Sequence, residues 1–307
     1  MRRTAFLICA MIAVNANAQP STTTPAVGTS DPTPPRSTRR SKIIAAASIG
    51  GIHLAYATWS YFAWYRGADT DDFHLEHTKW FDAKEYSGSA DKFGHFWSNY
   101  SLTRGTTAVL VAGGWNRFHS SLVAAGLTEV AFTLTELEDG FVFGFDWKDM
   151  VSNFSGAALG VLMENVPEVD RLLDFKVSYF PSRDFRRAFR KMNSVDVGQD
   201  YTGQTYLLSL HLGALPHALD SQWTSWSRFV DVSFGFETRN YSPAPMPRVD
   251  PREQTVFLGL SLDVQGVLRA VFPCDTTGRR IGIGAAEVIQ VPYTTLPVLS
   301  HSRYPDL

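Results

Sequence analysis

Acidic and amide side chains crowd a short stretch in the middle of the chain, residues 136–160. Within it Asp149, Asn153, Gly156 and Gly160 are spaced four, three and four residues apart, so in a helix they share one face. This face is polar in its first turn and bare afterwards. A second helix could therefore pack closely against it.

Three kinds of chemistry suit the residue types in and before this stretch. Lys92 and Arg104 could bind a phosphate that Asn153 orients. His95 could act as a general base positioned by Glu136. The third possibility is a divalent metal ion, which suits a mixed nitrogen and oxygen set. The candidate ligands are His95, Glu136, Asp139 and Asp149.

Hydrophobic patterns and turn residues predict four helices before Pro167. The first lies within Ile43–Tyr65, which runs 23 residues without a charge. As a helix it spans about 34 Å at roughly 1.5 Å per residue, enough to cross a bilayer. A buried helix of a soluble bundle is the alternative, because glycine and polar residues dilute its hydrophobicity.

The next three predicted helices are Asp91–Gly113, Arg117–Asp139 and Trp147–Val166. Gly140 is the expected stop of the third helix, because glycine commonly follows a helix C-terminus. That helix also has an apolar stripe spaced four, three and four residues apart. Its members are Val123, Leu127, Val130 and Leu134.

A turn at residues 114–116 would fold the second and third helices into an antiparallel hairpin. Side chains equidistant from the turn then lie side by side, and the fourth helix starts at the same end of the bundle. The expected pairs are His95 with Glu136, Lys92 with Asp139, and Arg104 with Glu129. The sequence thus predicts one buried group, here called the polar cluster: Asp91, Lys92, His95, Arg104, Glu136, Asp139, Asp149, Asn153 and Gly156. An ion-pair cluster that only supports the fold, with Asp146 as a helix N-cap, is the alternative.

The pattern changes after residue 167. Ser182–Asn193 is a basic amphipathic helix that suits an anionic membrane surface or a connector between domains. From Gln204 the hydrophobic period becomes two, which predicts strands. These are Tyr206–Leu212, Phe229–Phe236 and Val256–Val264, with Ile281–Val291 as a weaker candidate.

The predicted fold class is α+β: an N-terminal four-helix, membrane-associated bundle followed by a small antiparallel β-sheet region. The bundle takes residues 42–166, the basic connector 167–193, and the β region 194–307.

The first residues resemble a secretory signal. Arg2 and Arg3 precede an apolar stretch, and Ala16-Asn17-Ala18 is an A-x-A cleavage site. We therefore expect a signal peptide at residues 1–18, a disordered Ser/Thr/Pro-rich tether at 19–41, and an exported, envelope-associated chain. The net charge of −2 gives no electrostatic basis for binding nucleic acid.

Three motifs taken together are similar to the YfiM-like family of bacterial periplasmic lipoproteins, a domain of unknown function. They are Asp91-Lys92-Phe93-Gly94-His95, Glu136-Leu137-Glu138-Asp139-Gly140, and Asp149 to Gly156 (DMVSNFSG). VanZ-like membrane proteins are a more distant likeness. The resemblance covers roughly residues 90–180 and implies a small helical bundle in the envelope, with no established activity. It departs from the family at Glu138, at Asp146 and in the missing lipobox.

These observations favour a membrane-associated envelope protein. Its polar cluster would stabilise the bundle or recognise the polar head group of a membrane lipid. One alternative is a hydrolase or transferase on a lipid-linked or cell-wall substrate, using His95 and Glu136. The other is the divalent metal site, and apart from that ion the sequence indicates no cofactor. It shows no Ser or Cys nucleophile in a recognisable triad context and identifies no protein partner.

Overall fold

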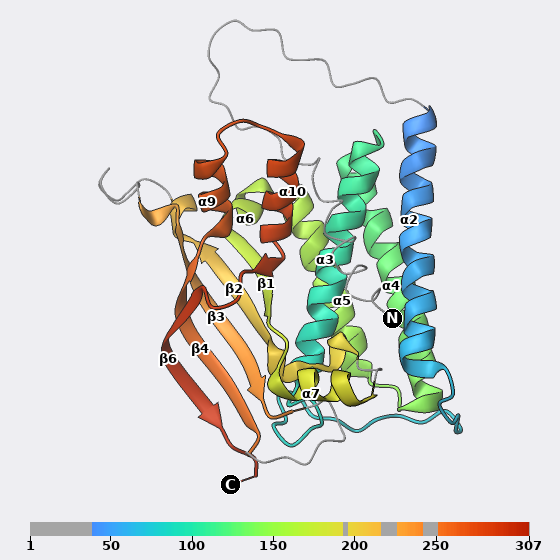
Figure 1. Ribbon diagram of the computed structural model, residues 1–307. Coiled ribbons are helices and arrows are strands. Elements are labelled where there is room, and N and C mark those ends of the chain that lie inside the picture. The colour runs from blue at the N-terminus through green and yellow to red at the C-terminus, as the bar shows by residue number, and fades with distance from the viewer. Residues whose placement is uncertain (1–38, 193–195, 216–225, 242–250, 307) are drawn as a thin grey trace, which may run out of the picture.

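The computed structural model of the protein describes residues 39–192, 196–215, 226–241 and 251–306. Long helices stand side by side in one half, and a six-stranded sheet lies beside them (Figure 1). The α+β class and the order of helices before sheet are confirmed. The signal peptide and most of the tether lie outside the described residues.

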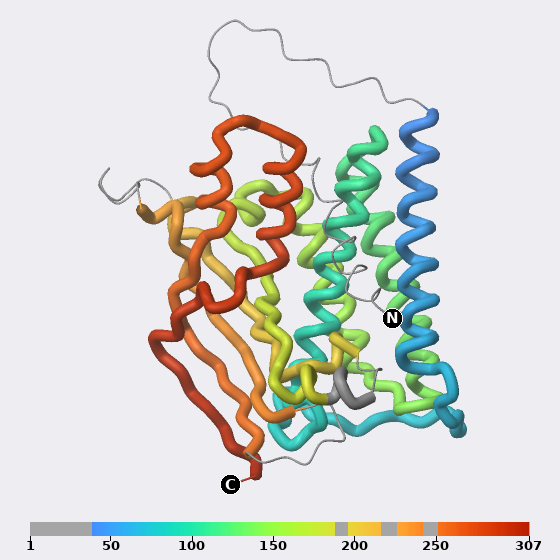
Figure 2. Tube along the Cα trace, viewed as in Figure 1, coloured from blue at the N-terminus to red at the C-terminus, as the bar shows by residue number. Residues whose placement is uncertain are grey.

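The bundle consists of α2 (Arg39–Ser60), α3 (Ala90–Ala112), α4 (Arg117–Val142) and α5 (Trp147–Asn165). The single π-helical turn η2 (Tyr61–Tyr65) continues α2. The trace shows α2 running along the outside of the bundle, where Ala45 and Ile49 pack against Val109 and Leu110 of α3 (Figure 2). In this described part, α2 together with η2 is the one helix long and apolar enough to cross a membrane, by length and composition.

Gly140 does not end α4, so the expected stop is wrong. The helix continues to Val142, and the chain leaves it at Gly144, whose φ is +111° and whose N–H donates to the Asp139 carbonyl at 2.6 Å. A Cβ on Gly140 would lie 2.1 Å from the ring of Phe73. Glycine is required at this position because the ring of Phe73, from the loop before α3, packs directly on the backbone of α4.

The sheet has the strand order β5-β1-β2-β3-β4-β6. All neighbouring pairs are antiparallel except β1 and β5, so the sheet is mixed rather than purely antiparallel. The strands are β1 (Leu173–Tyr179), β2 (Gln204–His211), β3 (Val230–Arg239), β4 (Glu253–Leu262), β5 (Ile289–Gln290) and β6 (Thr295–Arg303).

The segment 167–193, expected as a connector, contributes a strand to the sheet. It contains α6 (Pro167–Leu172), then β1, then α7 (Arg183–Met192). Strand β1 alternates apolar and polar residues in sequence (LDFKVSY), but its residues 174–177 are buried on both faces, so the charged Asp174 and Lys176 lie inside the protein. Three short 3₁₀ helices follow later in the chain, at Val197–Gln199, Tyr201–Gly203 and Leu212–Ala214.

The weaker strand candidate Ile281–Val291 is wrong over most of its length. Its first half lies in α10 (Thr277–Ala286), which Thr276 caps by accepting a hydrogen bond from Arg279 N. Only the two residues of β5 are extended. Two further elements were not predicted. One is β6, an edge strand that contains Pro297 and is mostly exposed, and the other is α9 (Val264–Val271).

An aromatic core joins the two halves of the molecule. Phe93 of α3 stacks on Phe236 at 4.3 Å between ring centroids, and Phe96 packs edge-on against Phe175 at 4.7 Å. The Trp97 indole N–H donates to the Val288 carbonyl just before β5, at 2.8 Å. One face of α3 therefore packs against the sheet, and its other faces pack against the bundle.

Candidate functional site

Lys92 lies at the centre of a buried acidic group. Its Nζ is 2.7 Å from Asp146 Oδ2, 2.9 Å from Asp149 Oδ1, 3.5 Å from Glu85 Oε1 and 3.7 Å from Asp91 Oδ2. The lysine side chain is only 6% exposed. Two of these acids come from the start of α5, one from α3 and one from the loop before it. Four carboxylates thus surround one ammonium group.

His95, one turn further along α3, connects all three inner helices. Its Nδ1 is 3.2 Å from Glu136 Oε1 of α4 and 3.0 Å from Asn153 Oδ1 of α5. The Asn153 amide donates to Glu136 Oε1 at 3.5 Å, and Asn99 donates to Asn153 Oδ1 at 2.6 Å. The imidazole keeps 18% exposure, whereas both asparagines are fully buried.

We call this assembly the bundle site. Its members are Glu85, Asp91, Lys92, His95, Asn99, Glu136, Asp146, Asp149 and Asn153. It brings together the expected pair His95 and Glu136. Glu85 and Asn99 are additional members that the sequence patterns did not predict, and Asp146 was expected only as an N-cap. Asp146 does cap α5, accepting from Lys148 N at 3.0 Å, and it binds Lys92 as well. Asn99 stands four residues after His95, so helical spacing was a usable signal for it.

Asp139 and Arg104 lie outside the bundle site. Asp139 Oδ1 accepts a hydrogen bond from the Tyr65 hydroxyl at 2.7 Å, so it faces the end of η2 instead of Lys92. The expected pairing of Arg104 with Glu129 is also wrong. A hairpin of two helices fixes which residues are level but not the angle of each side chain around the helix. The packing of α2 and α5 decides that angle.

Arg104 forms its own buried ion-pair group at the other end of α3. Its Nη2 is 2.7 Å from Asp170 Oδ1 and 2.9 Å from Glu287 Oε2, and its Nε is 3.4 Å from Glu164 Oε1. A second arginine, Arg117, also binds Glu164, at 2.6 Å. The three acids come from α5, α6 and the residue after α10. Arg104 therefore links α3 of the bundle to α6 and to the residue after α10, which lie beside the sheet.

The glycines of α5 allow the close packing that the bundle site needs. A Cβ on Gly156 would lie 2.1 Å from the carbonyl oxygen of Phe96, and one on Gly160 would lie 2.9 Å from Cβ of Thr103. The backbones of α3 and α5 therefore approach as closely as the G-x-x-x-G pattern allows. This approach brings Asp149 and Asn153 within reach of α3.

Burial and crowding shift the pKa values in the site. Burial raises the pKa of Glu136 to about 8 and that of Asp149 to about 7. Burial would lower the pKa of His95, but the carboxylates of Asp149, Glu136 and Asp91 outweigh it and raise that pKa to about 9. The surrounding acids thus favour the protonated form of His95, which donates a proton, whereas the general-base hypothesis needs His95 to accept one.

The expected metal ligands do not converge, because Asp139 pairs with Tyr65. A different set does: Asp91, His95 and Asp149 each offer an atom within 4.8 Å of the others. Both Asp149 oxygens, however, lie 2.9 and 3.1 Å from Lys92 Nζ. The lysine ammonium therefore already supplies the positive charge at this point.

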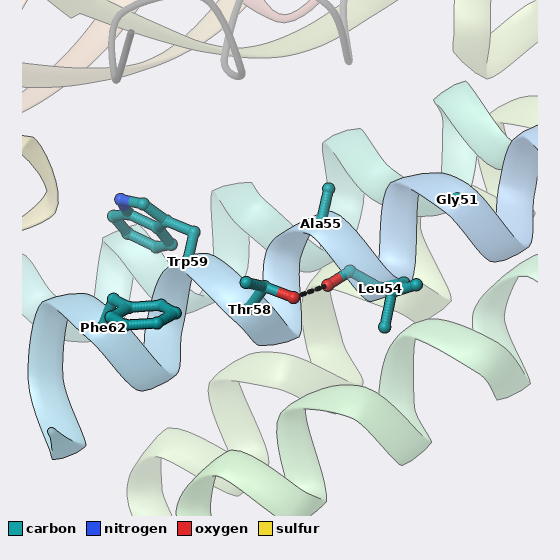
Figure 3. Close-up of a pocket in the computed structure, with 6 residues that line it drawn as sticks. All are labelled: Gly51, Leu54, Ala55, Thr58, Trp59 and Phe62. Atoms are coloured by element: carbon teal, nitrogen blue, oxygen red, sulfur yellow. Dashed lines mark hydrogen bonds between the residues drawn. The ribbon is translucent and has the colours of Figure 1, made fainter. Parts of the chain in front are cut away.

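A separate apolar groove lies on α2 and η2 (Figure 3). It is lined by Gly51, Leu54, Ala55, Thr58, Trp59 and Phe62. The Thr58 hydroxyl donates to the Leu54 carbonyl of its own helix at 2.7 Å (Figure 3). This groove shares no residue with the bundle site and offers a surface for apolar groups only.

The fold and the site together define an α+β protein whose helical bundle encloses a lysine–histidine–carboxylate site. Residues 78–165 match the model of the family described as "Predicted periplasmic lipoprotein (DUF2279)". No curated protein and no solved structure matches the chain. The matched segment contains every residue of the polar cluster. Its description agrees with the signal-like N-terminus in placing the chain outside the cytoplasm, in the cell envelope, and it names no cofactor. The YfiM-like and VanZ-like likenesses stay resemblances.

Proposed function

We propose that the chain is a membrane-associated protein of the cell envelope whose bundle site holds its helices together. The observation that supports membrane association is the inverted polarity of α4. Its apolar stripe faces outward, with Val130 60% and Leu134 61% exposed. Its inward positions include Thr128 and Glu136, both buried. Apolar side chains on the outside of a bundle with a polar interior suit contact with lipid.

The outer helix α2 has the same character. Ile43, Ile44, Leu54 and Phe62 are all more than half exposed, and no charged residue interrupts residues 43–65. Exposed apolar area costs about 25 cal/mol per Å² in water, and lipid contact removes this cost. The apolar groove of Figure 3 belongs to this surface.

The contacts of the bundle site support a role in holding the bundle. Lys92 and Asp149 join α3 to α5, His95 and Glu136 join α3 to α4, and Asn153 joins α5 to α4. Every pair of inner helices is thus linked by buried polar groups.

Recognition of a lipid phosphate is supported less well. Lys92 lies within 4.0 Å of four carboxylates and Arg104 of three, so neither cation is available to an incoming anion.

Fractionation tests membrane association. The chain should stay in the membrane fraction after high-salt and carbonate washes. Placing charge on the α4 stripe, as Val130→Glu with Leu134→Glu, should move it toward the soluble fraction. The matched control is Lys79→Glu, at an exposed loop position. Release of the wild type by salt alone would show surface attachment without insertion, and recovery in the cytoplasm would overturn the proposal.

Complementation tests the role of the site. The variant carrying Asp149→Leu and Asn153→Leu removes one partner from the contacts of Lys92 and of His95, and breaking buried pairs in this way is destabilising. A site that only holds the bundle therefore predicts lost function together with lowered abundance in a strain deleted for the gene. Loss of function with normal abundance and thermal stability would mean that the site binds a ligand.

One observation favours a second candidate, an acid–base enzyme acting on a lipid-linked or cell-wall substrate. His95 is the group of the site that contacts a buried glutamate and still reaches the surface, with 18% exposure. As an imidazolium it could protonate a leaving group. Such a role predicts that His95→Gln abolishes function in cells without lowering abundance, whereas a purely supporting His95 predicts a loss of abundance.

A further inference from the structure

A second group of charged side chains is buried inside the sheet, far from the bundle site in the sequence. His211 is the last residue of β2, Asp231 is the second residue of β3, and Asp263 follows β4. Asp174 and Lys176 lie on β1. None of these side chains is more than 7% exposed.

The sheet encloses this group because the chain at its β5 edge is hydrogen-bonded to β4, near the opposite edge. Strand β5 pairs with β1, and four residues later Thr294 accepts a hydrogen bond from Leu262 N of β4 at 2.9 Å. The Gln290 amide of β5 also donates to the Leu262 carbonyl, at 3.0 Å. The short helices α9 and α10 lie at this end of the sheet (Figure 1).

Three ligand atoms converge in this enclosure. His211 Nδ1 is 2.8 Å from Asp231 Oδ1 and 3.3 Å from Asp263 Oδ2, and all three atoms lie within 4.8 Å of one another. In a tetrahedral zinc site with metal–ligand distances of about 2.0–2.1 Å, neighbouring ligand atoms are about 3.3 Å apart. The two separations from His211 Nδ1, 2.8 and 3.3 Å, are close to this spacing, so a small ion could be bound after a modest shift of the ligands.

The other polar atom of each ligand is held by a further group. His211 Nε2 is 2.8 Å from Asp174 Oδ2. Asp231 Oδ2 accepts from Lys176 Nζ at 3.0 Å, and Asp263 Oδ1 accepts from the N–H of Gly266 at 2.8 Å. Such outer contacts orient metal ligands, and a carboxylate behind a histidine is a common one. The remaining atom of each ligand, His211 Nδ1, Asp231 Oδ1 or Asp263 Oδ2, faces the other two.

Charge also points to a cation. The enclosure holds three carboxylates and one ammonium, so with a neutral imidazole its net charge is about −2, which is costly to bury. In addition, Asp174 is fully buried and its Oδ1 has no hydrogen-bond partner among the described residues. A divalent cation would make the group neutral.

We infer that His211, Asp231 and Asp263, here called the sheet site, bind one divalent transition-metal ion, with Zn²⁺ the best fit to the ligand types and spacing. Asp174 fixes the orientation of His211. The bundle site differs because its lysine lies against the inner oxygens, where an ion would bind. In the sheet site Lys176 contacts only the outer oxygens, Asp231 Oδ2 and Asp174 Oδ2.

Zinc titration of the purified full chain tests this. The protein is stripped with a chelator and titrated with Zn²⁺, and bound metal is counted by elemental analysis. We expect one equivalent for the wild type and at least a tenfold weaker affinity for Asp263→Asn. Asparagine caps a helix as well as aspartate does, so this variant keeps the N-cap of α9. His211→Gln is the second variant.

The matched control is Asp149→Asn in the bundle site, which should still bind one equivalent. Thermal unfolding in chelator shows whether each variant is folded before metal is added. Two results would overturn the inference: a folded wild type that retains no Zn²⁺, or a loss of Zn²⁺ with Asp149→Asn while Asp263→Asn binds normally.

Discussion

Replacing Gly156 with alanine should destabilise the protein, although alanine is the better helix former. The added Cβ would lie 2.1 Å from the Phe96 carbonyl oxygen, whereas ordinary contact begins at 3.4 Å. The obstacle is backbone, so it cannot rotate away as a side chain could. Helices α3 and α5 would have to separate by about 1.3 Å locally, and overpacking of this kind costs about 1–3 kcal/mol.

The separation would also lengthen the polar contacts between the two helices. The Lys92–Asp149 distance of 2.9 Å would exceed 4 Å, and the His95–Asn153 hydrogen bond of 3.0 Å would be lost. Breaking a buried ion pair costs about 3–5 kcal/mol, although Lys92 keeps other acids nearby. The gain in helix propensity is only about 1 kcal/mol. The net loss in the free energy of unfolding should therefore be about 2–4 kcal/mol.

Gly126 supplies the matched control, because it lies inside α4 and a Cβ there meets no atom within 4 Å. Gly126→Ala should stabilise the protein by up to about 1 kcal/mol. The assay is chemical or thermal unfolding of both variants in the same detergent. If both variants change the free energy of unfolding equally, the backbones of α3 and α5 are not in contact, and close helix packing does not position the bundle site.

Three further outcomes follow from the buried charges. A double-mutant cycle of His95→Ala and Glu136→Ala should show coupling of about 0.5–3 kcal/mol in unfolding free energy, and simple additivity would contradict their contact. The raised pKa of Glu136, about 8 against an ordinary 4.5, stabilises the fold fully below pH 4.5 and loses this effect as pH rises through 8. Melting temperature should therefore fall between pH 6 and 9, and less so in Glu136→Gln; equal slopes would contradict the shift. Arg104→Met should cost about 3–5 kcal/mol because Asp170 and Glu287 lose their arginine contact while Glu164 keeps Arg117, and a neutral effect would show that these acids are solvated.

The elements that could be predicted from the sequence are those with local signals. Helices α3, α4 and α5 and strands β2, β3 and β4 have clear periods of 3.6 or 2, and most of their ends were found within three residues. Strand β1 was not predicted although its residues 173–179 alternate apolar and polar side chains, and the charged Asp174 and Lys176 on its polar side are buried rather than facing solvent. The apolar stripe of α4 was visible as a pattern, but the sequence could not say that it faces outward.

The bundle site was predicted in part, and the errors have one cause. Counting from the turn placed His95 beside Glu136, because that relation depends only on the hairpin. It failed for Lys92, which binds Asp149 instead of Asp139. The glycines of α5 allow that helix to pack closely against α3, which brings Asp149 to Lys92. A prediction from the hairpin of α3 and α4 alone does not include α5.

The sheet site had no comparable signal. Its three residues and the supporting Asp174 are scattered over residues 174–263, and no regular spacing relates them. Only the pairing of β1 with β2 and of β2 with β3 brings Asp174 and Asp231 to His211.

The contacts of Arg104 predict which residues should change together among relatives of this chain. Two of its three acids, Asp170 and Glu287, lie beyond residues 78–165, the segment that matches the family. A relative that keeps this segment without the sheet would lack two of the three acids, and an arginine at position 104 would no longer join two parts of the chain. We therefore expect positions 104, 170 and 287 to change together across lineages. The residue at position 104 would thus mark which relatives have a sheet attached to the bundle.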